Sequence, residues 1–161
     1  MFHVISRMSR GDIADAAVKR LLKEYTGEAR ISAKAAALAG ESVEEFVMLV
    51  GQKCAKLLAA KKKETVQKSD VDHVVLELDC KAKKAPGLHR EQRGLAEAGI
   101  ERIFRSGLGK HRISEPAKKA IVQYAEGRLM CIGHAAKVIA SAARRQTVQD
   151  KDIEGAITLS K

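Results

Sequence analysis

The chain of 161 residues contains no tryptophan, only two prolines and few aromatic residues, which make up 3% of the sequence. Alanine, leucine, lysine and glutamate are abundant instead, and these residues are good helix formers. Apolar positions recur with a helical period and show almost none of the alternation that is typical of strands. We therefore predict an all-α protein, which can bury a core because 45% of its residues are apolar.

Cysteine is also scarce, and Cys54, Cys80 and Cys131 stand far apart in the sequence. No Cys-x-x-Cys pair and no cluster of cysteine with histidine occurs, so neither a disulfide framework nor a zinc site is indicated. We interpret Cys54 and Cys131 as small core residues. We interpret His73 and His134 as ordinary surface or core residues rather than as ligands, and we expect no metal and no cofactor.

Long apolar runs and catalytic motifs are missing as well. The apolar run at the start of the chain is far too short for a signal peptide, and no stretch approaches the roughly 18 apolar residues that a membrane helix needs. We find no glycine-rich phosphate loop, no Ser/His/Asp arrangement and no paired carboxylates in a plausible cleft. We expect a soluble, cytoplasmic protein that has no membrane partner and no enzymatic activity.

Acidic residues are outnumbered by basic ones, with 20 Asp and Glu against 30 Lys and Arg, which gives a net charge of +10. The excess is uneven: residues 12–79 carry a net charge of −1, residues 80–93 carry +4 and residues 94–161 carry +5. A basic protein often has a polyanionic partner, most commonly nucleic acid. We therefore expect the two halves of the chain to contact such a partner unequally.

What the sequence does contain is a repeat. Arg-Ile-Ser, a long helical stretch and Thr-Val-Gln-x-x-Asp occur twice, starting at Arg30 and Thr65 in the first copy and at Arg112 and Thr147 in the second. Matched residues are always 82 positions apart, and residues 12–79 align with residues 94–161 without a gap and with 16 identities. We predict that the chain is a fused duplicate, because a gapless register is the usual mark of an internal repeat.

Each copy is predicted to contain a short, a long and a short helix. In the first copy these are a helix from near Ser9–Asp12 to about Tyr25, a helix over roughly 33–60 and a helix from about Ser69. Ser32 and its equivalent Ser114 are expected to cap the two long helices.

Each long helix has an apolar stripe, from Ala39 to Leu58 in the first copy and from Ile121 to Ile139 in the second. A unit of this size built around one long helix has almost no interior of its own. We expect each stripe to be covered by the other copy, since burial of apolar surface supplies most of the stability.

These motifs resemble the histone fold, and specifically archaeal-type histones in which two folds are fused as a histone doublet. The resemblance covers residues 10–160 and rests on the two repeated motifs and on Ile-Glu-Arg-Ile-Phe-Arg at residues 100–105. It implies two tandem histone folds that clasp head to tail in an intramolecular handshake. The implied domains are a basic tail over 1–9, fold 1 over 10–79, a basic linker over 80–92 and fold 2 over 93–161.

The resemblance also implies a partner, double-stranded DNA. In similar proteins the arginine of the first loop enters the minor groove beside a threonine of the facing loop, which here implies Arg30 with Thr147 and Arg112 with Thr65. A guanidinium suits a narrow, negative minor groove and reads no base there. The other implied DNA-binding residues are the basic side chains of the first helices and second loops: Arg20, Lys23, Lys62, Lys63, Arg102, Arg105, Arg144 and Arg145.

Two structural ion pairs are implied in the second loops, Lys63 with Asp70 and Arg145 with Asp152. A simpler interpretation stays open for each of these residues. A single Lys or Arg can belong to a solvated helix face, and an Asp can stand at a helix start because the helix dipole favours it there.

The sequence departs from the family pattern at two places. The residue before the second-loop threonine is commonly basic, but it is Glu64 in one copy and Gln146 in the other. A histidine near the end of the long helix often joins dimers into tetramers, but Ala60 and Ala142 stand at the matching positions. Self-association of doublets into pseudotetramers is therefore an open expectation.

The leading functional hypothesis is an architectural protein of the nucleoid that binds DNA without sequence preference and bends, wraps and compacts it. The alternative is a histone-fold interaction module of a transcription or repair assembly. A third hypothesis is a helical repeat protein that is unrelated to histones.

Overall fold

The computed structural model describes residues 13–79, 81–85 and 94–160. The predicted basic tail over 1–9 and the greater part of the predicted linker, including Cys80, lie outside the described residues.

Each half of the chain contains a short, a long and a short helix, joined by loops that each hold a two-residue strand. The first half consists of α2 (Asp15–Tyr25), β1 (Arg30–Ile31), α3 (Ala33–Lys61), β2 (Thr65–Val66) and α4 (Lys68–Leu78). The second half consists of α5 (Glu97–Leu108), β3 (Arg112–Ile113), α6 (Glu115–Ala142), β4 (Thr147–Val148) and α7 (Asp150–Leu159). The predicted all-α class and the order of helices are confirmed.

Serine caps begin both long helices, as the sequence predicts. The Ala35 N–H donates to Ser32 Oγ at 3.1 Å, and the Ala117 N–H donates to Ser114 Oγ at 3.3 Å. Each cap satisfies a main-chain donor that the first helical turn leaves without a partner. The long helices therefore start at equivalent positions in the two copies.

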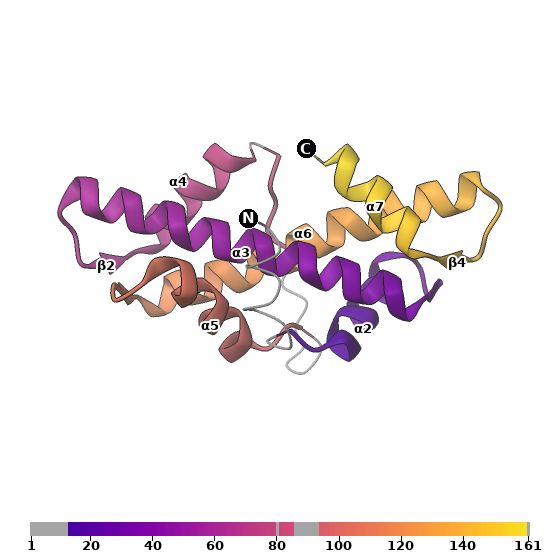
Figure 1. Cartoon of the computed structure of the whole chain (residues 1–161), viewed down its shortest axis with the longest axis horizontal. Helices are drawn as coiled ribbons and strands as arrows, with labels where there is room; N and C mark the ends of the chain where they lie inside the picture. Colours follow the sequence, from indigo (N-terminus) through magenta and orange to yellow (C-terminus); the bar gives the residue numbers. More distant parts are fainter. Residues whose placement is uncertain (1–12, 80, 86–93, 161) are drawn as a thin grey trace.

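The two copies pair head to tail through their loops (Figure 1). Strand β1 runs parallel to β4, with Arg30 opposite Thr147, and β2 runs parallel to β3, with Thr65 opposite Arg112. Each end of the molecule thus joins the first loop of one copy to the second loop of the other. This is the handshake that the family resemblance implies.

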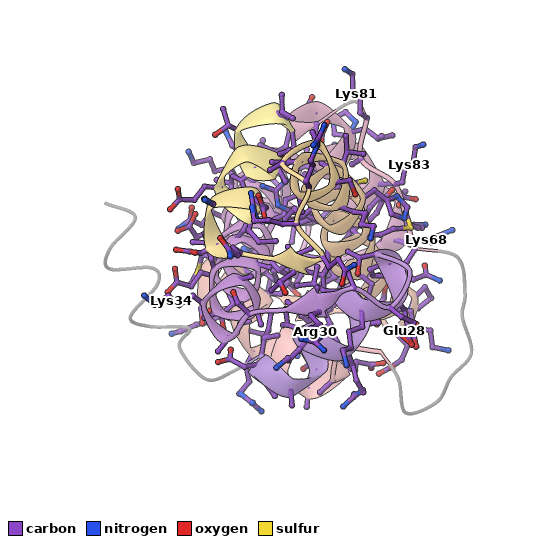
Figure 2. All side chains as sticks on the ribbon, turned by 90° about the vertical axis from the view of Figure 1, so that its right-hand side faces the viewer. Glu28, Arg30, Lys34, Lys68, Lys81 and Lys83 are labelled. Atoms are coloured by element: carbon purple, nitrogen blue, oxygen red, sulfur yellow. The ribbon has the colours of Figure 1, made fainter. Side chains whose placement is uncertain are left out.

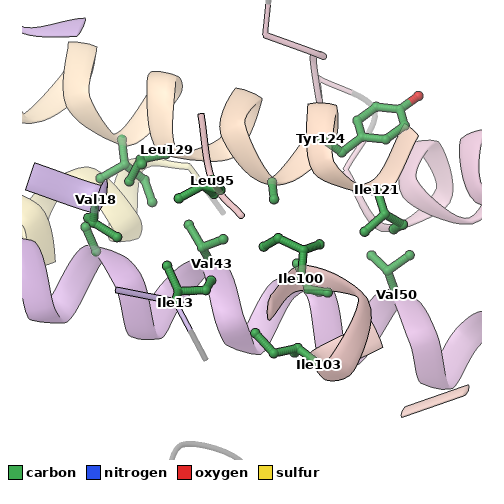
Figure 3. Close-up of a cluster of buried hydrophobic side chains, with 14 of the residues drawn as sticks. Ile13, Val18, Val43, Val50, Leu95, Ile100, Ile103, Ile121, Tyr124 and Leu129 are labelled. Carbon is green, nitrogen blue, oxygen red and sulfur yellow. The ribbon is translucent and has the colours of Figure 1, made fainter. Parts of the chain in front are cut away.

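A single core lies between the halves, and it draws side chains from both (Figure 3). Val43 and Val50 of α3 and Ile121 and Leu129 of α6 are at most 1% exposed. The long helices cross, with α3 packed against α5 and α7 and α6 packed against α2 and α4. Each apolar stripe is therefore covered by helices of the other copy.

The two equivalent crossings of short and long helices are not alike. Glycines let α3 and α5 approach closely, because a Cβ at Gly51 would collide with the Phe104 carbonyl oxygen and a Cβ at Gly107 with main-chain atoms of α3. At the equivalent crossing of α6 and α2, Gly133 faces Tyr25, whose Cβ would lie 3.2 Å from an added methyl group. Helix α3 consequently makes a more extensive contact with α5 than α6 makes with α2.

Residues 81–85, which belong to the predicted basic linker over 80–92, pack on α6. The Ala85 N–H donates to the Gln123 carbonyl at 3.1 Å, and Ala85 is 4% exposed. Gly127 leaves the space that the Lys83 carbonyl occupies. We call residues 81–85 the strap.

Side chains fasten the strap as well. Lys84 Nζ lies 3.4 Å from Asp72 Oδ1 and 5.2 Å from the centre of the Tyr124 ring. The Tyr124 hydroxyl donates to Asp72 Oδ1 at 2.8 Å, and burial together with this carboxylate raises the pKa of Tyr124 to about 12. Although Lys84 belongs to the predicted basic linker, its ammonium group is not left in solvent, because it binds a carboxylate of α4 and an aromatic face of α6.

Candidate nucleic-acid interface

The paired loops place an exposed arginine beside a threonine at each end of the molecule. Arg30 and Arg112 are exposed, and their strand partners Thr147 and Thr65 are half-buried. The main chain fixes this geometry, since the Arg112 N–H donates to the Glu64 carbonyl at 2.9 Å. The structure thus brings together the two arginine and threonine pairs that the sequence analysis names.

The second loop of each copy contains an ion pair. Lys63 Nζ lies 3.0 Å from Asp70 Oδ2, and the Arg145 guanidinium binds both carboxylate oxygens of Asp152, with Nη2 to Oδ1 at 2.7 Å. Both carboxylates are buried, with Asp70 3% and Asp152 0% exposed. Lys63 and Arg145 are therefore held within the loop by their own aspartates.

The same aspartates also begin the last helices. Asp70 accepts the Gln67 N–H at 2.9 Å, and Asp152 accepts the Gln149 N–H at 2.8 Å, so each completes a capping box. Asp70 and Asp152 are therefore both helix-start residues and ion-pair partners.

These contacts lower the pKa of both carboxyl groups. At Asp152 the hydrogen bond from Arg145 is the largest cause, and it outweighs burial, which acts in the opposite direction. At Asp70 burial by itself would raise the pKa, but the Gln67 N–H and the Lys63 ammonium together lower it. Both aspartates are therefore ionised at neutral pH and fasten the loops to the helix starts.

Lys62 and Arg144 occupy the same repeat position, and both have a left-handed backbone, with φ of 55° and 59°. This conformation costs roughly 1–2 kcal/mol in a residue with a Cβ, and glycine adopts it without that cost. Both side chains are exposed. Each loop thus places an exposed cation at a position where glycine would be less strained.

The predicted basic residues of the first helices lie along the edge of the molecule that joins the two loop pairs. Arg20 and Lys23 of α2 and Arg102 and Arg105 of α5 are exposed, and both helices lie along the lower edge in Figure 1. Seen end-on, Arg30 lies on the lower side too, whereas Lys81 and Lys83 lie toward the top (Figure 2). The two loop pairs and the helices α2 and α5 together form a basic surface along this side of the molecule, which we call the basic edge.

A charge network on α5 and α6 was not predicted from the sequence. Arg105 Nε donates to Glu101 at 2.9 Å, while Lys118 Nζ lies 3.4 Å from Glu101 and 3.1 Å from Glu115. The hydrogen bond from Arg105 is the largest cause of the lowered pKa of Glu101. The spacing of Glu101 and Arg105 by four residues was the available signal for their pairing.

The cysteines have different environments. Cys54 is fully buried, and burial raises its thiol pKa to about 12, with a further contribution from the negative charge of Asp70. Cys131 is half-buried and lines a groove, so only Cys54 fits the expectation of a core residue.

Both helical histidines are exposed. His73 lies 3.1 Å from Glu77, and His134 meets the Tyr25 ring edge-on at 6.2 Å between ring centres. Within residues 13–79, 81–85 and 94–160, no group of three or more His, Cys, Asp or Glu side chains could hold a metal ion. In the same part of the chain, no helix has the length and apolar character needed to cross a membrane.

Two comparisons with known proteins agree with this architecture. The family described as "Histone-like transcription factor (CBF/NF-Y) and archaeal histone" matches the chain twice, over residues 13–75 and 93–157. The crystal structure of the histone from Methanopyrus kandleri is similar in fold, with a TM-score of 0.77 and 24% sequence identity over 92% of this chain and 95% of that chain. Among curated proteins no sequence matches. The two successive family matches confirm the predicted tandem doublet.

Proposed function

Since this chain belongs to the family of histone-like transcription factors (CBF/NF-Y) and archaeal histones, we propose that it is an architectural protein of the nucleoid. It binds double-stranded DNA without sequence preference and bends, wraps and compacts it. The family itself suggests the coarser role, a DNA-binding architectural or transcription-factor-like protein, and its members are typically not enzymes.

The observation that carries the proposal is the recurrence of one arrangement at both ends of the basic edge. Arg30 beside Thr147 and Arg112 beside Thr65 stand in the same strand register. An exposed guanidinium can enter a narrow minor groove and contact phosphates, and it needs no particular base to do so. Two such sites on one molecule suit a continuous duplex that reaches from one end to the other.

The helices between the loop sites supply the second element of the proposal. Cations on α2 and α5 would bind phosphates in the middle of the same duplex, so the DNA is held at its ends and centre by one protein edge. Bending a short duplex costs on the order of 1–6 kcal/mol, and additional phosphate contacts can offset that cost. Lys62 and Arg144 would add phosphate contacts beside the loop arginines.

Affinity for unrelated duplexes tests the proposal. We expect two random-sequence duplexes of equal length to be bound equally, and the affinity to fall steeply with salt, because each phosphate contact contributes about 0.9 to the log-log slope. A closed circular plasmid relaxed in the presence of the protein should change its linking number if the DNA is wrapped. Sequence-dependent retention or a salt-independent affinity would contradict the proposal.

The alternative, an interaction module, has one structural observation in its favour. A groove of about 550 Å³ lies between the ends of α4 and α7, on the edge opposite to α2 and α5. Its lining includes Leu78, Cys131, Ala135 and Leu159, of which Leu159 is 72% exposed. The same duplex assay discriminates the two functions, since a module that uses the fold as scaffold would retain neither duplex.

A further inference from the structure

The two first helices differ in charge at two equivalent positions. At one of them α2 has Glu24 where α5 has the neutral Ser106, and at the other the sign of the charge is reversed. Helix α2 has Lys19 where α5 has Glu101, in the register that pairs Arg20 with Arg102 and Lys23 with Arg105. Lys19 and Lys23 are one helical turn apart and both are exposed. In the part of the chain that the structure describes, neither ammonium group has a carboxylate within ion-pair distance.

On α5 the corresponding cation is already engaged. Glu101 accepts a hydrogen bond from Arg105 at 2.9 Å and lies 3.4 Å from Lys118, which also binds Glu115 at 3.1 Å. All four groups are charged. The network therefore contains two carboxylates, Glu115 at the start of α6 and Glu101 on α5. Arg105 cannot approach a phosphate without either leaving Glu101 or bringing this carboxylate toward the DNA.

The first copy cannot build this network. The positions equivalent to Glu115 and Lys118 are Ala33 and Ala36, and Ala36 is 1% exposed. The first turn of α3 has Lys34 but no carboxylate, so nothing there can engage the cations of α2 as Glu115 and Glu101 engage Lys118 and Arg105. The asymmetry concerns the first helices and not the loops. In the loops the charge difference can have the opposite sign, since the first copy has Glu28 where the second copy has Lys110.

We propose that Lys19 is a phosphate-binding residue, and that Glu101 weakens DNA binding at α5 by repelling phosphates and by retaining Arg105. Helix α2 is then the principal phosphate-binding helix of the basic edge, and α5 is the weaker one. This inference rests on the proposed DNA-binding function and adds to it which helix binds more strongly and through which residues.

The repeat offers an exchange experiment in the full-length chain. Lys19→Glu gives α2 the residue of α5, and Glu101→Lys gives α5 the residue of α2. We expect Lys19→Glu to weaken binding to a random-sequence duplex about tenfold at moderate salt and to lower the salt slope by about one unit. We expect Glu101→Lys to tighten binding by a similar factor and to raise the slope.

Glu154→Lys is the matched control, because it makes the same charge change at an exposed position of α7, on the opposite edge. It should tighten binding clearly less than Glu101→Lys does. Thermal unfolding of each variant shows whether the fold is retained. Lys19→Gln and Glu101→Gln repeat the test with half the charge change, and they replace the reversed variants if those fail to fold.

The outcomes separate the inference from the function on which it rests. If wild-type protein binds duplex but Lys19 variants bind as tightly, or if Glu101→Lys gains no more than Glu154→Lys, the inference is overturned while the DNA-binding function stands. If wild-type protein binds neither of two unrelated duplexes, the proposed function itself fails. A weakened Lys19 variant together with a tightened Glu101 variant supports the inference.

Discussion

Glu64 is the residue that distinguishes the two loop sites most sharply. It precedes the loop threonine beside Arg112, whose N–H binds the Glu64 carbonyl at 2.9 Å. At the other end the equivalent residue is the neutral Gln146. An exposed carboxylate close to phosphates opposes binding by on the order of 1 kcal/mol, from Coulomb's law with a surface-like dielectric.

Alanine substitution should therefore affect the two loop arginines unequally. We predict that Arg30→Ala loses more DNA affinity than Arg112→Ala, although Lys110 and His111 partly compensate for Glu64 at the second site. Glu64→Lys should tighten binding. Titration of the three variants against one random-sequence duplex measures this, and a Glu64→Lys variant with unchanged or weaker affinity would remove the basis for the difference.

Asp152 is a charged residue whose loss should cost considerable stability. Asp152→Asn leaves the Arg145 guanidinium without its anion and weakens the cap of α7, so we expect a loss of about 2–3 kcal/mol in the free energy of unfolding. Urea unfolding followed by circular dichroism measures it. Asp150→Asn is the control, because this half-buried residue lies two positions before Asp152 and the structure shows no such pair for it; the change should alter stability by less than about 1 kcal/mol.

The same aspartates predict the acid dependence of stability. Because the folded-state pKa values of Asp70 and Asp152 are lowered, their contribution is complete above the unfolded carboxyl pKa of about 3.9. It is lost as the pH falls through the lower folded-state values. We expect wild-type stability to fall below about pH 4, and expect Asp152→Asn to lose less over that range; a parallel fall in both proteins would contradict the assignment.

Residue contacts within one loop could be predicted from the sequence, and contacts between distant elements could not. Lys63 and Asp70 stand seven residues apart around one loop, and the family resemblance implied their pairing. Tyr124 and Asp72 are separated by 52 residues, and their hydrogen bond depends on where α4 meets α6. The Lys118 contact with Glu101 likewise depends on the packing of α5 against α6.

The helix starts show what local sequence signals can and cannot locate. The serines before α3 and α6 cap them as predicted, because their side chains satisfy first-turn donors directly. Helix α2 begins at Asp15, later than the predicted Ser9–Asp12, with an extended Ala14 that makes no side-chain cap. Asp15 in the first turn is favoured by the helix dipole, which is a weaker signal than a cap.

The close packing of α3 against α5 leads to a prediction about the stability of a Gly107 variant. Gly107→Ala places a methyl group against the main-chain atoms of Met48 and Gln52, so it should destabilise the fold by about 1–3 kcal/mol. Gly40→Ala is the matched control within α3, because its added Cβ would meet only Val18 Cγ2 at 3.5 Å, an ordinary contact.

At Gly40 the better helix propensity of alanine should leave stability unchanged or raise it by up to about 1 kcal/mol. Chemical denaturation of both variants compares them under the same conditions. Equal effects at the two glycines would mean that helix propensity, rather than the close approach of α3 and α5, decides the outcome.

At the scale of the whole molecule, neither half should be stable alone. The stripe of α6 is covered by α2 and α4, and both β3 and β4 pair with strands of the first half. We predict that the fragment 94–161 unfolds or self-associates into a homodimer. Circular dichroism with sedimentation analysis tests this, and a well-folded monomer of the fragment would show that the handshake is not required.

The repeat was sufficient to predict that the two copies cover each other's apolar stripes, and the family resemblance supplied the head-to-tail handshake. It could not predict where the equivalence breaks down. The difference between Gly107 and Tyr25 at equivalent crossings and the docking of the strap on Gly127 both arise from contacts between the copies. Alignment of the two copies shows which positions are equivalent, but it does not show which residues of one copy meet which residues of the other.

The pairing of β1 with β4 has a consequence for synthesis on the ribosome. Arg30 emerges early, but its partner Thr147 is translated more than a hundred residues later. At about 5–20 residues per second the nascent first copy waits on the order of ten seconds for its partner, with an apolar helix face exposed. During this interval a neighbouring nascent chain on the same message competes with the chain's own second copy, so correct pairing depends on the tether and on translation speed.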